Sequence, residues 1–97
     1  MTINTNLKYK DLTIALEGRL DTTTAPELEE ELSKYPDAES VVFDLKDLEY
    51  ISSAGLRVLL GEQKHMNQGG KMVIKNVNDS IMEVFEITGF VDILTIE

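Results

Sequence analysis

The sequence predicts an α/β fold in which an N-terminal β-hairpin is followed by alternating helices and strands. Two strand-like runs adjoin each other near the start of the chain, and apolar residues at helical spacing then alternate with short, continuous apolar runs. Strands joined by helical crossovers run parallel, so we expect a mostly parallel sheet of about four to five strands, covered by about three helices. The 97 residues fit one domain, spanning 1–97.

The hairpin is predicted from the first twenty residues. Residues 2–9 alternate weakly, as an edge strand does, and residues 12–17 are rich in β-branched and apolar side chains. Lys10-Asp11 between them favours a tight turn. We expect Gly18-Arg19-Leu20-Asp21 to leave the sheet.

A first helix is predicted after this segment. Thr24 suits the N-cap, Pro26 fits the first turn, and Glu27 completes a capping box with Thr24. Pro36 ends the helix near Tyr35. One apolar stripe follows the helical spacing and consists of Leu28, Leu32 and Tyr35.

A second βα unit follows. The apolar run Val41–Leu45 predicts a strand buried on both faces, as parallel strands are, and residues 46–53 are expected to connect it to a helix. This helix runs from about Ala54 to Asn67 and is closed by Gly69-Gly70. Its predicted core stripe is Leu56, Leu59, Leu60 and Met66.

The last third repeats the alternation. Met72–Ile74 predicts a strand, and either Asn78 or Asp79 suits the N-cap of a third helix that ends at Gly89. The run Val91–Ile96 predicts a final strand. The predicted buried face of the third helix is Ile81, Val84 and Phe85.

Charge and composition narrow the classes of function. Nine basic residues against eighteen acidic ones give a net charge of −9, and a chain this acidic is repelled by nucleic acid and by anionic lipid. A basic protein surface is a plausible partner, although acidity that serves only solubility explains the charge equally well. No signal peptide pattern and no apolar run of about 18 residues are present, so we expect a soluble, cytoplasmic protein without membrane insertion.

The sequence contains no pattern that requires catalysis. It has no cysteine, no nucleophile elbow, no Walker motif and no dinucleotide-binding glycine turn. The single histidine, His65, suits the end of a helix and cannot by itself build a metal site. We therefore expect no enzyme activity, no catalytic residue, no metal and no cofactor.

A serine pair that opens a helix is the most distinctive feature. Ser52 and Ser53 precede the second predicted helix, and Gly55 stands in its first turn. One serine is explained by the N-cap alone. The backbone N–H groups at a helix start also favour an anion, so a phosphate added there is tolerated while it changes the surface charge. Both interpretations remain open on these residues.

The segment Asp-Leu-x-x-Leu-x-Tyr-Ile-Ser-Ser-Ala-Gly-Leu over residues 44–56 resembles the signature of the STAS domain (sulfate transporter and anti-sigma factor antagonist). It is most similar to free-standing anti-sigma factor antagonists. Three further segments match in order, and together they span essentially the whole chain: Gly18-Arg19-Leu20-Asp21, Gly69-Gly70-Lys71-Met72, and Phe85-Glu86-Ile87-Thr88-Gly89-Phe90.

The resemblance implies a partner and a switch. Such proteins bind an anti-sigma factor that is also a serine kinase, and phosphorylation at the start of the second helix breaks the complex until a serine phosphatase resets it. Aligned on Gly55, the phosphorylated residue is Ser53, with Ser52 as the alternative. The family pattern carries Asp at position 52 and Ser or Thr at position 54. Asp21 corresponds to a family Asp near the switch serine, although a cap or turn role before the first helix explains it equally well. Arg57, in the first turn of the second helix, suits either a partner contact or an ion pair with a glutamate of the first helix. The candidate partner-binding residues are Asp21, Thr22, Thr23, Ser52, Ser53, Ala54, Gly55 and Arg57.

Two other functions remain compatible with this resemblance. The chain would also suit a non-phosphorylated STAS subunit of a membrane transport complex that docks on its ATPase, and the serine in place of the family Asp favours that alternative. An enzyme or small-ligand carrier on the same fold is the third hypothesis. We expect a monomer or a weak dimer.

Overall fold

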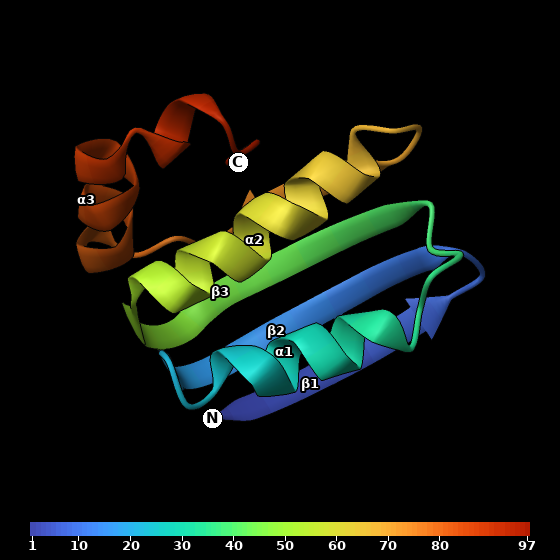
Figure 1. Cartoon of the computed structure of the whole chain (residues 1–97), viewed down its shortest axis with the longest axis horizontal. Helices are drawn as coiled ribbons and strands as arrows, with labels where there is room; N and C mark the ends of the chain where they lie inside the picture. The colour runs from blue at the N-terminus through green and yellow to red at the C-terminus, as the bar shows by residue number, and fades with distance from the viewer.

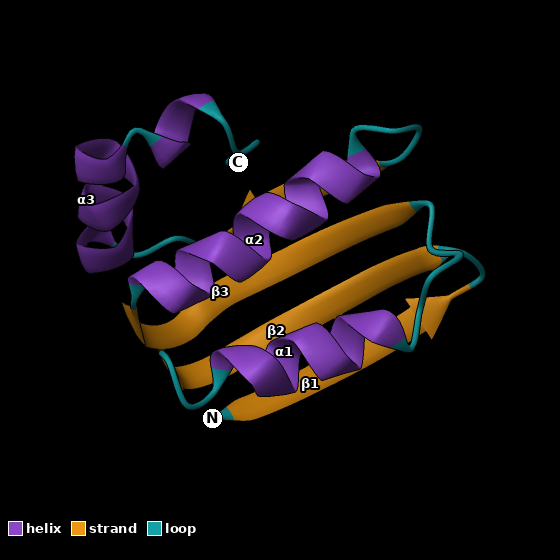
Figure 2. Ribbon diagram, viewed as in Figure 1, coloured by secondary structure: helices purple, strands orange, loops and turns teal.

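The computed structural model describes residues 1–97 as a four-stranded sheet with two long helices side by side on one face (Figures 1 and 2). A third helix lies beyond the end of the sheet (Figure 1). None of the helices has the length and apolar character of a membrane span. The elements, in chain order, are β1 (Thr2–Lys8), β2 (Asp11–Leu20), α1 (Ala25–Ser33), β3 (Ser40–Ile51), α2 (Ser53–Met66), β4 (Lys71–Lys75), α3 (Asp79–Thr88) and the 3-10 helix η1 (Phe90–Asp92).

The sheet is mixed, in the spatial order β1-β2-β3-β4. β1 and β2 form the predicted antiparallel hairpin, and β2–β3 and β3–β4 are parallel because a helix crosses over between each pair. The hairpin turn lies one residue earlier than predicted, at Tyr9-Lys10, where Tyr9 adopts a positive φ of 58°. The predicted fold class is thus confirmed.

β2 and β3 are longer than the sequence suggested. Residues 46–51, predicted as a connection, belong to β3, and Gly18–Leu20, predicted to leave the sheet, still pair with it. Register shifts between Ala15 and Glu17 and between Gly18 and Arg19 break the regular alternation of these strands. This irregularity is why the ends of the strands could not be predicted from alternation. In β3, for example, the buried residues that follow Leu45 are three positions apart rather than two.

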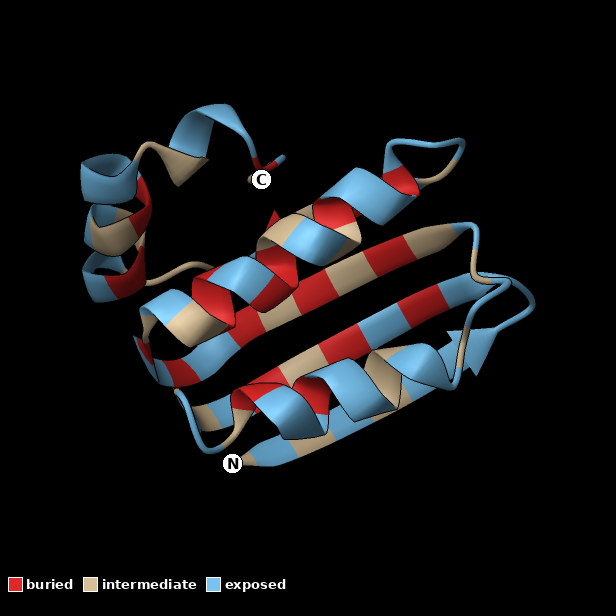
Figure 3. Ribbon diagram, in the orientation of Figure 1, coloured by how far each residue is buried: buried red, intermediate tan, exposed pale blue.

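The core lies between the sheet and the pair α1–α2. Figure 3 shows buried residues alternating along β2 and β3. In β3 the residues between the buried ones, Val42 and Asp44, are only half-buried, so the prediction of a strand buried on both faces was wrong. The helices cover one face only. The largest fully buried side chains include Leu12, Ile14, Leu16, Leu28, Phe43, Leu45, Leu59, Ile74 and Phe85.

Both long helices approximate their predicted spans. In α1, Leu28 is buried, whereas Leu32 packs only partly against the core, as does Tyr35, which follows the end of the helix. The predicted stripe of α2 is confirmed for Leu56, Leu59 and Met66, while Leu60 is half-buried. The structure adds Val58 and Gln63 to the buried face of α2.

The C-terminal segment departs most from prediction. Asn78 caps α3 by accepting from the Ile81 N–H over 2.9 Å, and Gly89 ends the helix with φ 81°, as expected. The predicted strand 91–96 does not form: residues Phe90–Asp92 make a 3-10 helix, and only Ile96 bridges Ile74 of β4. The carbonyl of Phe90 accepts from the backbone of residues 93 and 94, which holds this segment in turns.

Candidate functional site

The serine pair lies at the edge of the sheet where β2 and β3 both end. Parallel strands present their carboxyl ends at the same edge, so the residues that follow each strand become neighbours. The Ser52 N–H donates to the Leu20 carbonyl over 2.9 Å, one residue before Asp21. Strand pairing therefore brings Asp21 close to the serine pair.

Asp21 organises the turn between β2 and α1. Its Oδ1 accepts from the Thr23 hydroxyl over 2.7 Å, from the Thr23 N–H over 3.0 Å and from the Thr24 N–H over 3.2 Å. The hydrogen bond from the Thr23 hydroxyl lowers the pKa of the Asp21 carboxyl, with smaller contributions from the backbone N–H groups. Thr22 and Thr23 are held exposed at this corner.

The side chain of Thr24 does not form the predicted N-cap of α1. Thr24 stands at the N-cap position of α1, but its side chain makes no capping hydrogen bond, so the capping box with Glu27 is absent. Its Oγ1 instead accepts from the Asp21 N–H and donates to the Arg19 carbonyl, each over 2.8 Å. Thr24 thus closes the turn that presents Asp21.

The two serines differ in their surroundings. Ser52 is the N-cap of α2: it is half-buried, has extended backbone, and its Oγ accepts from the Gly55 N–H over 3.4 Å. Ser53 is the first residue of the helix and is exposed. The hydroxyl at position 52 serves the fold, whereas the one at position 53 is presented to solvent.

Gly55 is required by packing. A Cβ at this position would stand 2.7 Å from Leu20 Cγ and 2.9 Å from Ile51 Cγ1, closer than real contacts allow. The backbone at Gly55 therefore approaches the ends of β2 and β3 closely. Gly55 is buried, so it holds the start of α2 against the sheet beneath the exposed residues.

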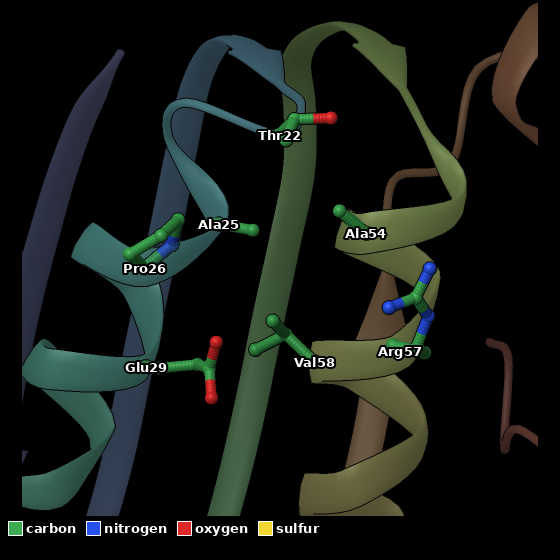
Figure 4. Close-up of a pocket in the computed structure, with 7 residues that line it drawn as sticks. All are labelled: Thr22, Ala25, Pro26, Glu29, Ala54, Arg57 and Val58. Carbon is green, nitrogen blue, oxygen red and sulfur yellow. The ribbon is translucent and has the colours of Figure 1, made fainter.

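An open hollow lies between the starts of α1 and α2. Its volume is about 290 Å³, and Figure 4 shows Glu29 on α1 pointing toward Val58 on α2, with Ala54 opposite Ala25. Ala54 is half-buried and Arg57 is exposed. The remaining lining residues are Ala25, Pro26 and Val58.

Sequence reasoning missed Arg19 and Tyr50. Arg19 places its guanidinium 4.2 Å from the centre of the Tyr50 ring, and its Nε lies 3.9 Å from Asp21 Oδ2. Tyr50 is 41% exposed, so the pair that it forms with Arg19 lies at the surface. Both arginines of the chain, Arg19 and Arg57, therefore lie on this end of a strongly acidic protein. Arg19 was detectable only as a neighbour of Asp21, since its pairing with Tyr50 depends on the register of β2 and β3.

Comparisons with known proteins agree with this architecture. Residues 2–97 match the STAS domain family. The chain is 34% identical over 103 residues to the anti-sigma-B factor antagonist of Listeria monocytogenes, covering 100% of this chain and 90% of that protein. It is 41% identical over 88 residues to the putative anti-sigma factor antagonist BtrV of Bordetella bronchiseptica, covering 88% and 76%.

The fold is that of SpoIIAA. The unphosphorylated form of this anti-sigma factor antagonist superposes with a TM-score of 0.85 at 16% identity, covering 99% of this chain and 88% of SpoIIAA. The phosphorylated form, from Bacillus, gives a TM-score of 0.79 at 16% identity and covers 99% and 91%. The resemblance found in residues 44–56 is thereby confirmed, and the chain belongs to the STAS domain family.

Proposed function

We propose that this protein is an anti-sigma factor antagonist: a single non-catalytic domain, residues 1–97, that binds an anti-sigma factor and so releases a sigma factor. The names of its relatives support this, since proteins 34% and 41% identical to it are described as an anti-sigma-B factor antagonist and a putative anti-sigma factor antagonist. The alignment with the Listeria relative covers the whole of this chain and 90% of that protein.

The proposed binding surface is the edge where β2 and β3 end. It combines the turn at Asp21 with the first turn of α2, and the hydrogen bond from Ser52 to Leu20 joins the two. Gly55 contributes indirectly by setting the depth of α2. The side chains proposed to meet the partner are Asp21, Thr22, Thr23, Ser52, Ser53, Ala54 and Arg57.

The observation that carries the proposal is the exposure of Ser53 at the first position of α2. Of the two serines, Ser53 has the hydroxyl that is not used as the helix cap. We propose that the anti-sigma factor, acting as a serine kinase, phosphorylates Ser53. The phosphate adds about −1.5 to −2 charge in the middle of the binding surface. The start of a helix tolerates that charge, so association is lost while the fold survives. A serine phosphatase restores the unmodified form.

The test uses an anti-sigma factor kinase encoded in the same genome, purified, with ATP. We expect this kinase to bind the wild-type chain and to phosphorylate it, with the modified peptide mapped to Ser53 by mass spectrometry. Ser53→Ala should remain unmodified and Ser52→Ala should still be modified. Modification that persists in Ser53→Ala would overturn the assignment of Ser53. If the purified kinase neither binds nor phosphorylates the chain, the proposal fails, and affinity capture of a transporter ATPase from lysate would then favour the transport subunit.

A further inference from the structure

A groove continues from the serine end along the whole contact between α1 and α2. The two helices lie side by side (Figure 1), and three hollows of about 290, 210 and 240 Å³ follow one another between them. Neighbouring hollows share walls: Arg57 and Val58 belong to the first and second, and Leu32 and Glu62 to the second and third. The groove is therefore continuous with the surface that carries Ser53.

Gly61 lines the middle hollow, and no contact within the chain requires a glycine at this position. A Cβ built at Gly61 meets nothing within 4 Å, in contrast to Gly55 in the same helix. Glycine weakens a helix interior relative to alanine, so a glycine without a close neighbour needs another explanation. Because Gly61 has no side chain, the groove stays open at this point, and no atom of the protein fills the space.

The same hollow is lined by two carboxylates without an ionic partner. Glu29 reaches across from α1 (Figure 4), and Glu62 follows Gly61 on α2. Neither takes part in any ion pair of the structure. Glu62 is half-buried, and this burial raises the pKa of its carboxyl, with His65 opposing the shift. Arg57 also lines the hollow, but it forms no ion pair with either carboxylate. A cation brought from outside would therefore find two carboxylates without an ion pair, of which Glu62 is half-buried and Glu29 is exposed.

We propose that the α1–α2 groove, centred on Gly61, receives a segment of the anti-sigma factor that places a lysine or arginine side chain between Glu29 and Glu62. This inference rests on the proposed function and extends the binding surface well beyond the serine end. The open space over Gly61 accommodates the segment, and the two carboxylates select its charge.

Filling the groove tests the inference directly. Gly61→Trp places a large side chain in the empty space, and Lys64→Trp is the matched control, because Lys64 is exposed on the same helix and lines none of the three hollows. Affinity for the purified anti-sigma factor kinase is measured by calorimetry, with circular dichroism to verify the fold. We expect Gly61→Trp to weaken binding by about tenfold or more, and Lys64→Trp to leave it within about twofold.

Charge variants provide a second, independent readout. Glu62→Gln should weaken binding and reduce its dependence on salt, because one attractive pair with the partner is lost. Glu30→Gln is the control, since Glu30 is exposed on α1 and lines no part of the groove. If the wild-type chain binds the kinase, and Gly61→Trp and Glu62→Gln both bind it with the affinity of wild type, the groove inference fails while the proposed function stands. If the wild-type chain binds no anti-sigma factor, the proposed function fails, and the groove inference, which rests on it, fails as well.

Discussion

The backbone of Ser52 donates a hydrogen bond to the carbonyl of Leu20 over 2.9 Å, and this bond joins two segments that are 32 residues apart (52 − 20). It is the last link between β2 and β3. Beyond it the chain turns into α1 on one side and into α2 on the other. The turn at Asp21 and the exposed hydroxyl of Ser53 consequently face solvent together. Single substitutions on either side of this bond should therefore distinguish residues that stabilise the fold from residues that bind the partner.

Ser53→Asp should weaken binding to the anti-sigma factor by about tenfold or more without loss of stability. The added carboxylate stands at a helix start, where negative charge is favourable, but it meets the partner on a surface that already carries Asp21. Binding is measured by calorimetry and stability by thermal unfolding. Ser53→Ala is the control, which should bind like wild type. Equal affinities of Ser53→Asp and wild type would contradict the switch.

Ser52→Ala should cost about 0.5–1 kcal/mol of unfolding free energy, because the variant loses the N-cap acceptor for the Gly55 N–H. The bond is long at 3.4 Å, which places the cost at the low end for a cap. The corresponding fall in Tm is about 2–8 °C for a domain of this size. Ser53→Ala should change the unfolding free energy by less than about 0.5 kcal/mol. A larger loss at position 53 than at position 52 would show that the roles of the serines are reversed.

Two glycines of α2 should respond oppositely to the same substitution. Gly55→Ala forces a methyl group against Leu20 and Ile51, and overpacking of this kind costs about 1–3 kcal/mol. Gly61→Ala meets no atom and should stabilise the helix by up to about 1 kcal/mol. Urea unfolding of the two variants beside wild type measures both effects. Destabilisation by Gly61→Ala would mean that the space above this residue is filled in the folded chain.

The pKa of Asp21 should lie below its ordinary value of 3.8, chiefly because the Thr23 hydroxyl donates to the carboxylate. A depressed folded pKa means that the carboxylate stabilises the fold at pH values above about 4 and that this contribution is lost as the pH falls through the folded pKa. Thr23→Val should raise the pKa of Asp21 towards 3.8 in an NMR titration. Thr22→Val is the control, and an equal shift in both variants would rule out the hydroxyl as the cause.

The acid sensitivity of the whole chain should be reduced, but not removed, by Asp21→Asn. Asp44 also has a lowered pKa, first because Asn76 donates to its Oδ1 over 3.0 Å and then because the Lys46 N–H does. Both carboxylates contribute stability above the ordinary pKa and lose it on acidification. Thermal unfolding between pH 7 and pH 3 should therefore show a smaller decline for Asp21→Asn than for wild type, and the smallest for the double variant with Asp44→Asn.

Local signals in the sequence determined the hairpin, the three helices and most of their ends. Asn78 and Ser52 act as caps, and Gly89 stops α3, because capping depends on side chains within three residues of the backbone groups that they satisfy. The segment from Asp44 to Leu56 also carried the family resemblance, since it is continuous in sequence. These features need no knowledge of what packs against them.

Tertiary contacts decided the rest. The true ends of β2 and β3 depend on pairing between Arg19 and Tyr50 and between Leu20 and Ile51, which irregular register conceals from any periodic pattern. The hydroxyl of Thr24 does not cap α1, because it donates instead to the carbonyl of Arg19 in β2. The groove above Gly61 exists only because two helices distant in sequence lie side by side, and the space between helices is a property of their packing and not of either sequence alone.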